Sequence, residues 1–598
     1  MDKKNTFIGA LLFAAAFLVL IYTQRYSPQR PQPAEIRREV KQEMAAQPAS
    51  PSAIVRADEP TFTTARAEST GANITRLSNG FVQVNFTDFG GAIRDVAFRK
   101  YPIAVGSEEP FVFNSLHSDP ILAFVGAPGL DKGTRYQLVS KTDTEVVFQA
   151  VLDQRLEVTR RYRLSPDKSP ATDPYIIRTE TTFRNLTDKE LAPMHAAFSI
   201  GTAAPNNAID NGLQLSTEFW NGKDQTLVRR ASLESSGGFP LFGWGAHGPR
   251  AVVTGEGPIA WATVKNQFFA SILTPDEPAA GLETRRVKLL DALPDSDTKA
   301  YGITGAVDVD VRALPARGQA SFNGDIYVGP KEYVRLANSD VFRKDQDRVM
   351  DFGNFIFRFC AAILLTLMTW IHSWAVNWGI SIILTTLALK FAFLPLTVSQ
   401  SRSSRRMQKI QPEMKGIREK YKDNPQKQQQ ATMELFKKHK VNPLGGCLPM
   451  LLTIPFFFAF FRMLQSAAEI RFASFLWIHD LSGPDTVLAI NSQLFGSFNL
   501  NILPFVLCAV AFFQMRVTPQ PSVDNAQMKM MKFMPLMFLF FYYTWPAALS
   551  LYSTVNGLFT IGQQLVVNQI PDPDPDEAAF EAKSGKGRPT KNVTPKKG

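Results

Sequence analysis

One lysine, Lys390, lies in a run that is otherwise uncharged from Ala375 to Ser401. In a helix that rises about 1.5 Å per residue, Lys390 would lie roughly 16 Å from the end of the run. A lysine stem of about 6 Å is too short to bring the ammonium comfortably to water by snorkelling. A lysine at the centre of a membrane span costs at least ~2.5–3.5 kcal/mol on insertion scales. Lys390 is therefore the first candidate for a functional group.

The surroundings of Lys390 must stabilise its charge without a carboxylate, because the other predicted core spans contain no Asp or Glu. Uncharged polar residues are present in the apolar segments instead: Thr385, Thr386, Thr453, Gln514, Tyr552, Ser553, Thr554 and Asn556. We interpret this pattern as a water-filled, positively charged cavity between helices. Such a cavity suits an anion carried by a transporter, or the acidic hydrophilic tail of an inserting polypeptide. Alternatively, Lys390 has no functional role and is tolerated because the bilayer is locally thinner.

The N-terminal residues have the pattern of a first membrane span. Lys3 and Lys4 precede an uncharged run from Asn5 to Gln24, whose twenty residues span roughly 30 Å as a helix, one bilayer core. A cleaved signal peptide would need a shorter apolar core and a small-x-small site, so we expect an uncleaved anchor over 1–24 with a cytosolic N-terminus. Residues 25–64 are rich in Pro, Ala, Gln and charge and indicate a flexible linker.

Residues 65–335 show the period-two pattern of β-strands. Every second side chain along 156–164 and 175–184 is suited to burial, and the side chains between them are polar. Residue pairs typical of turns, such as Asn211-Gly212, separate such runs. This pattern predicts an all-β sandwich, which lies outside the cytosol because the anchor starts inside. The domain has no catalytic motif and no cysteine, and its histidines stand alone. We therefore expect a binding or scaffolding domain without cofactor or metal; an enzyme in this domain is the competing hypothesis.

A basic loop fixes the topology of the C-terminal third. Residues 402–440 contain twelve Lys or Arg against four acids, which places the loop in the cytosol. Since the sandwich is outside, only one of the two apolar segments before the loop can cross. We assign the crossing to 375–401 and expect 336–374, with Arg358 and its late tryptophans, to lie along the outer interface.

The segment 441–570 supplies the remaining four core spans. Val441–Phe461 crosses outward and Thr486–Met515 crosses back, with an apolar core from about Leu500. Phe533–Pro571 is uncharged for 39 residues, about twice a bilayer as one helix, and must fold back at Thr544-Trp545-Pro546. The chain thus has one anchor plus five core spans, and the basic tail 571–598 ends in the cytosol.

The cytosolic loop has its own apolar pattern. Its first half carries a seam with spacings of 3 and 4, made of Met407, Ile410, Met414, Ile417 and Tyr421. Asp423-Asn424-Pro425 then ends one helix and starts another, on which Met433 and Phe436 form a matching stripe. We predict a helical hairpin over 402–440 whose basic face touches anionic lipid or docks to ribosome or translocation machinery.

Several ordered motifs resemble the YidC family of membrane-protein insertases, in its Gram-negative branch. These are Asn377-Trp-Gly-Ile-Ser-Ile-Ile before Lys390 and Pro395-Leu-Thr, Val441-Asn-Pro-Leu-Gly-Gly-Cys-Leu-Pro, Trp477-Ile-His-Asp-Leu-Ser, Phe533-Met-Pro, and Leu551-Tyr552. The match is dense over about 340–570, and the anchor and outer domain follow the layout of that branch. The family's groove cation, usually arginine, falls on Lys390, which keeps the charge but loses the planar fork. Thr453 replaces a common glutamine and Ser553 a common aromatic residue.

The resemblance implies an insertase and chaperone of the bacterial inner membrane that uses no ATP and no cofactor. The implied groove is open to cytosol and lipid, and its candidate residues here are Lys390, Thr386, Thr385, Thr453, Gln514, Tyr552 and Ser553. The implied partners are nascent membrane proteins, the Sec translocon, membrane lipids, and ribosome and targeting machinery at the 402–440 hairpin and tail, without a specific nucleic-acid sequence. Both termini would be cytosolic and 25–350 periplasmic. The periplasmic domain would be a supersandwich like that of sugar mutarotases, without their catalytic residues.

Overall fold

The computed structural model describes residues 71–569, apart from 128, 208–209, 235–247, 249, 292, 295–296, 354, 423, 440–447, 493–495 and 519–533. The predicted anchor 1–24, the linker 25–64 and the tail 571–598 lie outside the described residues. The chain forms two compact units. Among the described residues, a β unit contains 71–352 together with Gln465–Phe472, and a helical unit contains Gly353–Leu464 together with 473–569.

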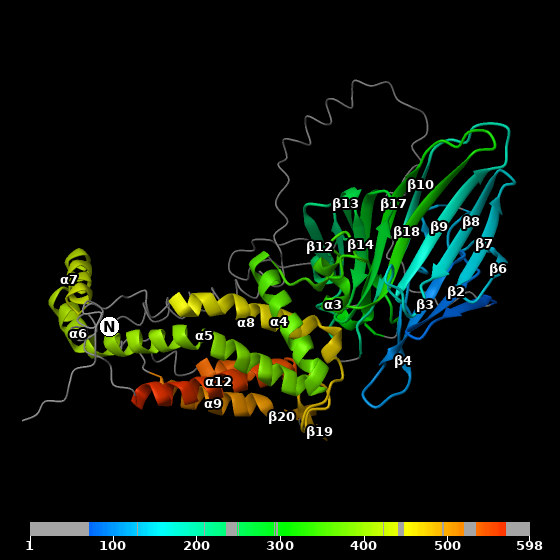
Figure 1. The fold of residues 1–598 in the computed structure, drawn as a ribbon. Coiled ribbons are helices and arrows are strands. Elements are labelled where there is room, and N and C mark those ends of the chain that lie inside the picture. Colours follow the sequence, from blue (N-terminus) through cyan, green and yellow to red (C-terminus); the bar gives the residue numbers. More distant parts are fainter. Residues whose placement is uncertain are drawn as a thin grey trace, which may run out of the picture. The chain divides into compact units, whose positions relative to one another are not determined.

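The β unit is built from three antiparallel sheets, which confirms the predicted sandwich (Figure 1). The nine-stranded sheet has the order β12 (Gln225–Arg229), β11 (Ser216–Trp220), β14 (Trp261–Lys265), β15 (Phe269–Pro275), β18 (Gln319–Pro330), β9 (Ile176–Asn185), β8 (Leu156–Leu164), β7 (Glu145–Leu152) and β6 (Gln137–Lys141). The five-stranded sheet has the order β13 (Val252–Ile259), β16 (Ala279–Lys288), β17 (Tyr301–Val311), β10 (Met194–Ala203) and β5 (Phe124–Val125). The third sheet runs β1 (Ile74–Ser78), β2 (Val82–Thr87), β3 (Ala92–Pro102) and β4 (Pro110–Phe113).

The period-two pattern of the sequence is the pattern of burial. On β8, Leu156, Val158, Tyr162 and Leu164 are buried, while Glu157, Thr159, Arg161 and Arg163 on the other face are exposed or at intermediate depth. The same row contains a fully buried arginine, Arg160, whose Nη1 donates to the carbonyl of Gly90 at 2.6 Å. A buried guanidinium is costly unless it finds acceptors, and this bond ties β8 of the nine-stranded sheet to the turn between β2 and β3 of the four-stranded sheet.

The described part of the helical unit contains six apolar helices: α4 (Phe355–Ala375), α5 (Trp378–Lys409), α8 (Leu448–Ser466, whose last two residues fall in the β unit), α9 (Leu503–Val517), α11 (Met534–Tyr542) and α12 (Ala547–Gln569). The break between α11 and α12 coincides with the predicted turn at Thr544-Trp545-Pro546. The uncharged run Thr486–Met515 is not one helix. Its first half forms a hairpin of β19 (Thr486–Ser492) and β20 (Gly496–Asn501), and its helical part follows from Leu503.

The start of α5 explains the Asn-Trp-Gly motif of the sequence. Asn377 caps the helix, because its side-chain oxygen accepts from the amide of Ile380 at 3.1 Å while its side-chain nitrogen donates to the carbonyl of Ser474 at 3.0 Å. Gly379 lies against the ring of Phe475, where a Cβ atom would overlap the ring. These two residues fix the direction in which α5 leaves the turn, and therefore where Lys390 lies.

Among the described residues, two helices are long and apolar enough to cross a membrane, Phe355–Ala375 and Trp378–Lys409, and Leu503–Val517 is shorter. The helix α4, expected along the interface, passes this test of length and composition as well. Its outward face is apolar and aromatic, with Phe355, Phe359, Trp370 and Trp374 more than half exposed. The number of spans remains a prediction.

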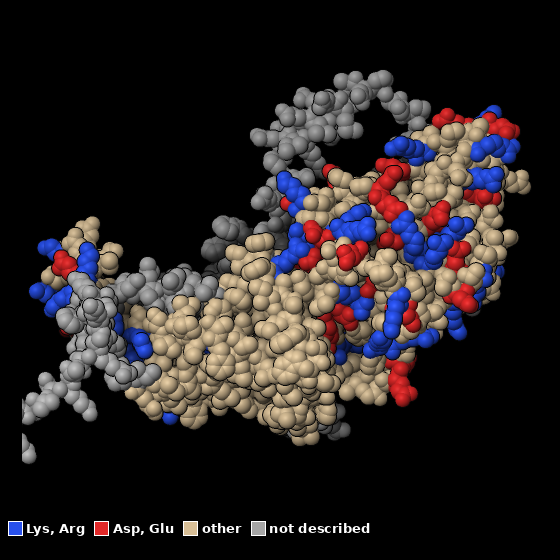
Figure 2. Space-filling model, viewed as in Figure 1, with Lys and Arg blue, Asp and Glu red and all other residues tan. Residues whose placement is uncertain are grey.

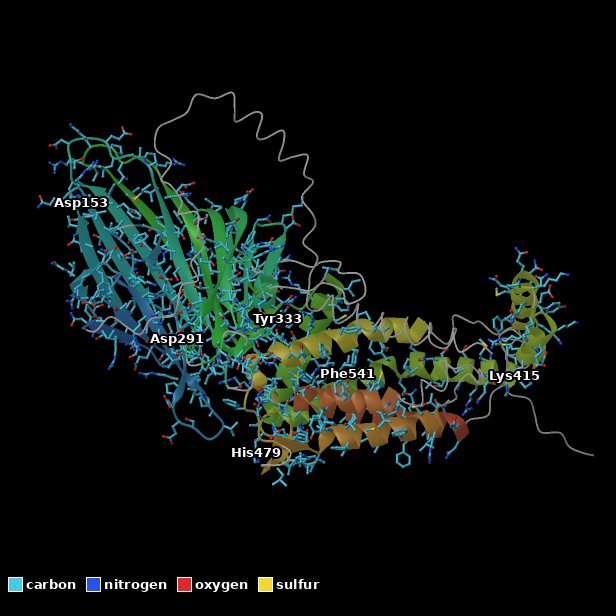
Figure 3. All side chains as sticks on the ribbon, turned by 180° about the vertical axis from the view of Figure 1, so that it is seen from behind. Asp153, Asp291, Tyr333, Lys415, His479 and Phe541 are labelled. Carbon is cyan, nitrogen blue, oxygen red and sulfur yellow. The ribbon has the colours of Figure 1, made fainter. Side chains whose placement is uncertain are left out.

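The predicted cytosolic hairpin consists of α6 (Gln411–Lys420) and α7 (Pro425–Lys438), and residues 402–409 continue α5. Its core contains Ile410 and Leu435, with Met407, Met414, Ile417 and Phe436 packed against them. The assignment of Met433 to this stripe was wrong, because its side chain is 47% exposed; Leu435 takes its place. Charged side chains cover α6 and α7, where Lys415 is labelled in Figure 3. Figure 2 shows an almost uncharged surface on the apolar helices.

Candidate functional site

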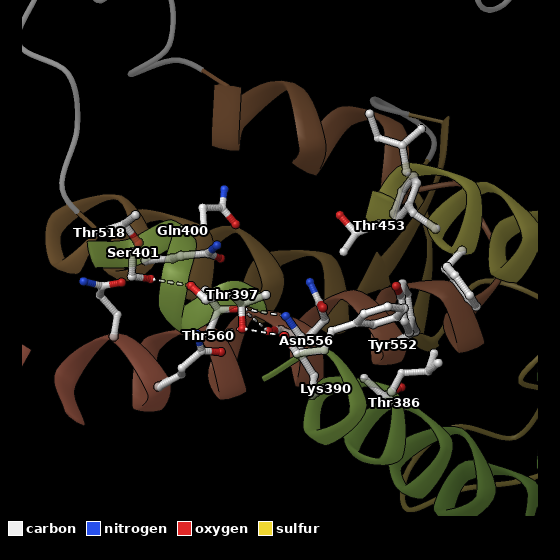
Figure 4. A pocket seen from close by; sticks show the side chains of 18 of the residues that line it. Thr386, Lys390, Thr397, Gln400, Ser401, Thr453, Thr518, Tyr552, Asn556 and Thr560 are labelled. Atoms are coloured by element: carbon white, nitrogen blue, oxygen red, sulfur yellow. Dashed lines mark hydrogen bonds between the residues drawn. The ribbon is translucent and has the colours of Figure 1, made fainter. Parts of the chain in front are cut away.

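A cavity of about 600 Å³ lies within the helical unit, between α5, α8, α9, α11 and α12 (Figure 4). Its described lining residues are Thr386, Leu389, Lys390, Phe393, Thr397, Gln400, Ser401, Ser404, Thr453, Ile454, Phe456, Phe457, Gln514, Thr518, Phe538, Tyr552, Asn556, Thr560, Gln563 and Gln564. Lys390 carries the single charge in this set. The cavity is thus large enough for several side chains of a polypeptide segment.

Lys390 is half-buried on α5 and extends to α12. Its Nζ donates to the hydroxyl of Thr560 at 2.9 Å, and it lies 6.0 Å from the centre of the Phe559 ring. Both contacts favour a positive charge, one through a hydroxyl lone pair and one through the negative face of the ring. The ammonium has three N–H donors, so one hydrogen bond leaves two for other acceptors.

Two walls of the cavity differ chemically, and α9 contributes Gln514 beside them. On α5 and α12, all the described lining residues except Leu389 and Phe393 carry a polar group. On α8 and α11 the lining residues are Ile454, Phe456, Phe457 and Phe538, with Thr453 as the one polar side chain among those described. Such a cavity offers hydrogen bonds on one side and apolar contact on the other.

Hydrogen bonds join the two polar helices along the cavity. Gln563 of α12 donates to the hydroxyl of Thr397 of α5 at 2.9 Å, whereas Lys390 of α5 donates to Thr560 of α12. At the end of the cavity next to the hairpin, Arg405 donates to the side-chain oxygen of Asn568 at 2.8 Å. These bonds hold α5 and α12 together as one wall.

Five of the seven site residues predicted from the sequence line this cavity: Lys390, Thr386, Thr453, Gln514 and Tyr552. The other two are not among its described lining residues. Thr385 is fully buried on α5, and the hydroxyl of Ser553 pairs with that of Tyr542 at 2.9 Å, which joins α12 to α11. Both lie one position along the helix from a lining residue, so a rotation of 100° turns them away from the cavity.

The polar residues on the side of the cavity nearer the hairpin were not predicted from the sequence. Their spacing was the available signal: Lys390, Thr397, Ser401 and Ser404 share one face of α5, and Tyr552, Asn556, Thr560 and Gln563 share one face of α12. Intervals of 3, 4 and 7 residues place polar groups above one another on a helix.

The β unit buries a second group of charges, on β11 and β14 and next to them. Lys265 forms an ion pair with Glu218, and both side chains are almost completely buried. Lys265 also donates to the carbonyl of Val349 at 2.8 Å. Burial raises the pKa of Glu218 to about 7, and burial lowers the pKa of the nearby Lys331 to about 7. We interpret this group as structural, because Lys265 joins the carboxylate of Glu218 to the carbonyl of Val349 within the buried part of the unit.

Comparison with known proteins adds the family to this geometry. The family model described as 60Kd inner membrane protein matches residues 370–574, and the model described as YidC periplasmic domain matches residues 75–367. The membrane protein insertase YidC of Syntrophobacter fumaroxidans is 32% identical over 73% of each chain, and that of Chlorobaculum tepidum is 28% identical over 97% of each chain. A crystal structure of an active YidC insertase is 17% identical, covers 85% of this chain and 95% of that chain, and has a TM-score of 0.32. The extent of the matches to these relatives and to both models shows that the chain belongs to the YidC family of membrane protein insertases, inner-membrane proteins that are not enzymes.

Proposed function

We propose that this chain inserts proteins into the bacterial inner membrane and acts there as a chaperone. The cavity receives the hydrophilic segment of a nascent membrane protein, and the client's apolar helix then passes into lipid. The relatives named membrane protein insertase support the general activity. The observation that carries the detailed proposal is the charge of Lys390 on the polar wall of the cavity.

The physical obstacle to insertion is the polar segment of the client. Each peptide group that enters hydrocarbon without a hydrogen-bond partner costs roughly 2–7 kcal/mol. The hydroxyl and amide groups of α5 and α12 shorten the apolar distance that such a segment must cross. Lys390 adds an attraction for Asp and Glu, which at about 4 Å is worth about 4 kcal/mol in a protein-like dielectric, compared with about 1 kcal/mol in bulk water.

The proposed topology follows the charge of the loops. The termini and the hairpin 402–440 are cytosolic, residues 25–350 are periplasmic, and an anchor with five core spans crosses the membrane. The density of Lys and Arg on α6 and α7 supports this orientation. In this arrangement the hairpin and the basic tail meet ribosomes, targeting machinery and lipid headgroups, and some clients are shared with the Sec translocon.

The test is insertion of a small client with an acidic translocated segment into vesicles that contain the purified protein. Lys390→Ala removes the charge and should slow insertion of this client, whereas Lys390→Arg keeps the charge and should retain most of the activity. The same client with Asn in place of each Asp serves as the matched control, and should respond weakly to both substitutions. Normal insertion of the acidic client by Lys390→Ala would refute the role of the charge.

A parallel measurement separates insertion from transport. Vesicles that contain the wild-type protein are loaded with a small anion. They should insert the client but release the anion no faster than loaded vesicles without the protein. Flux that depends on Lys390, without insertion, would instead establish an anion transporter. Insertion without flux supports the proposal.

A further inference from the structure

The hydrogen bond between Lys390 and Thr560 holds the ammonium at one place on the cavity wall, which a charge alone would not need. Thr560 of α12 accepts the hydrogen bond from the Lys390 ammonium at 2.9 Å, and it also contacts the backbone of its own helix. Its hydroxyl donates to the carbonyl of Asn556, one turn earlier, at 2.7 Å. The single hydroxyl proton is thereby used within α12.

This second bond fixes the role of the hydroxyl. A threonine hydroxyl has one proton and two lone pairs. Because the proton points to Asn556, the lone pairs point away from the helix backbone, toward Lys390. Thr560 is therefore oriented as an acceptor for a cation before any client arrives, and the orientation needs no rearrangement when the ammonium approaches.

Lysine benefits from such an acceptor more than arginine would. Its four-carbon stem has many rotamers, and its ammonium is a compact charge without the rigid fork of a guanidinium. Holding a free lysine stem in one geometry costs up to about 2 kcal/mol in side-chain entropy. The Thr560 hydroxyl, with the Phe559 ring on the adjacent position, holds the ammonium against the polar wall and leaves its other donors for the cavity.

We propose that Thr560 is a positioning residue, which fixes the Lys390 ammonium at the α12 wall so that it meets acidic residues of the client. The inference rests on the function proposed above and names a determinant of client selectivity within it. The alternative is that Thr560 only joins α12 to α5. That structural role would affect all clients alike and would not depend on the charge at 390.

The experiment compares Thr560→Val with Thr560→Ser in the full-length protein in vesicles, using the acidic client and its Asn-substituted partner. Valine keeps the shape but removes the acceptor, and serine restores the acceptor. Thr554→Val is the matched control: Thr554 lies on the same helix, its hydroxyl makes the same bond one turn back, to the carbonyl of Ser550 at 2.8 Å, and it does not line the cavity. Each variant is also made in a Lys390→Gln background.

We expect Thr560→Val to slow insertion of the acidic client roughly five-fold, the effect of one lost hydrogen bond, and to change the neutral client little. Thr560→Ser should recover most of the loss, and Thr554→Val should behave as wild type. In the Lys390→Gln background, Thr560→Val should have no further effect. Equal losses for both clients, or an undiminished loss in the Lys390→Gln background, would overturn the positioning role.

The same set of variants separates this inference from the proposed function. If Lys390→Gln slows the acidic client and Thr560→Val does not, the charge acts without Thr560 and only the positioning role fails. If Lys390→Gln itself inserts the acidic client normally, the role of the charge fails and the positioning role fails with it.

Discussion

A carboxylate placed at Thr560 should neutralise the cavity from within. In Thr560→Asp, the new carboxylate would lie about where the hydroxyl accepts from Lys390 at 2.9 Å. At a separation of about 4 Å and an effective dielectric of about 20, the two charges attract by about 4 kcal/mol. An acidic client must compete with this internal partner. If solvent screening leaves only a quarter of the attraction, about 1 kcal/mol, insertion of the acidic client still slows about five-fold.

Protease protection of the inserted client in vesicles measures this effect. Thr560→Asn is the control, because it has the shape of the aspartate variant without its charge. The acidic client should be slowed by the aspartate variant relative to the asparagine variant, and the client with Asn in place of Asp should be inserted equally by both. If the aspartate variant inserts the acidic client as fast as the asparagine variant, the charge of the cavity does not act on the client.

Further predictions concern stability. Leu435→Ala should destabilise the hairpin by roughly 2–4 kcal/mol and Met433→Ala by well under 1 kcal/mol, since Leu435 is in its core and Met433 is half exposed; hydrogen exchange of α6 and α7 measures both. Lys265→Met should cost roughly 3–5 kcal/mol because the buried Glu218 loses its cationic partner, and the loss would be seen as faster exchange in β11 and β14. Because the fold raises the pKa of Glu218 from 4.5 to about 7, the stability that its protonated form contributes is lost as pH rises through this range. Because the fold lowers the pKa of Lys331 from 10.5 to about 7, the stability that its neutral form contributes is lost as pH falls through that range. Exchange in these strands, corrected for its intrinsic pH dependence, should therefore be fastest near pH 7; a monotonic dependence would contradict the assignment.

The sequence predicted the parts of this molecule that follow from local periodicity. The alternation around Val158 identified the sandwich, the break at Pro546 separated the last two helices, and the seam around Ile410 identified the hairpin. Lys390 was found because a charge within an apolar run has a large cost that local structure cannot offset. Each of these signals lies within a few residues of the feature that it predicts.

The rest depends on contacts between distant segments. The hairpin β19–β20 was predicted as part of a span, because an uncharged run looks the same in a strand and in a helix. Gln465–Phe472 joins the β unit through contacts such as that of Arg471 with the carbonyl of Pro102 at 2.7 Å, across more than 360 positions of the chain. Thr560 became a candidate only when α12 was found beside α5.

The attraction between Lys390 and an acidic client is strong enough to bind the client and weak enough to let it go. The attraction of Lys390 for a carboxylate, about 4 kcal/mol at close range, is available as soon as the polar segment enters. A client helix that passes into lipid buries on the order of ten large apolar side chains, each worth about 1.5–3 kcal/mol. The transfer of the helix therefore outweighs the electrostatic hold several-fold, so the charge can accelerate entry without trapping the client. The apolar side chains of α8 and α11 face the polar wall of α5 and α12 across the cavity, and they give the client's apolar helix a surface to contact while its polar segment is still held at Lys390.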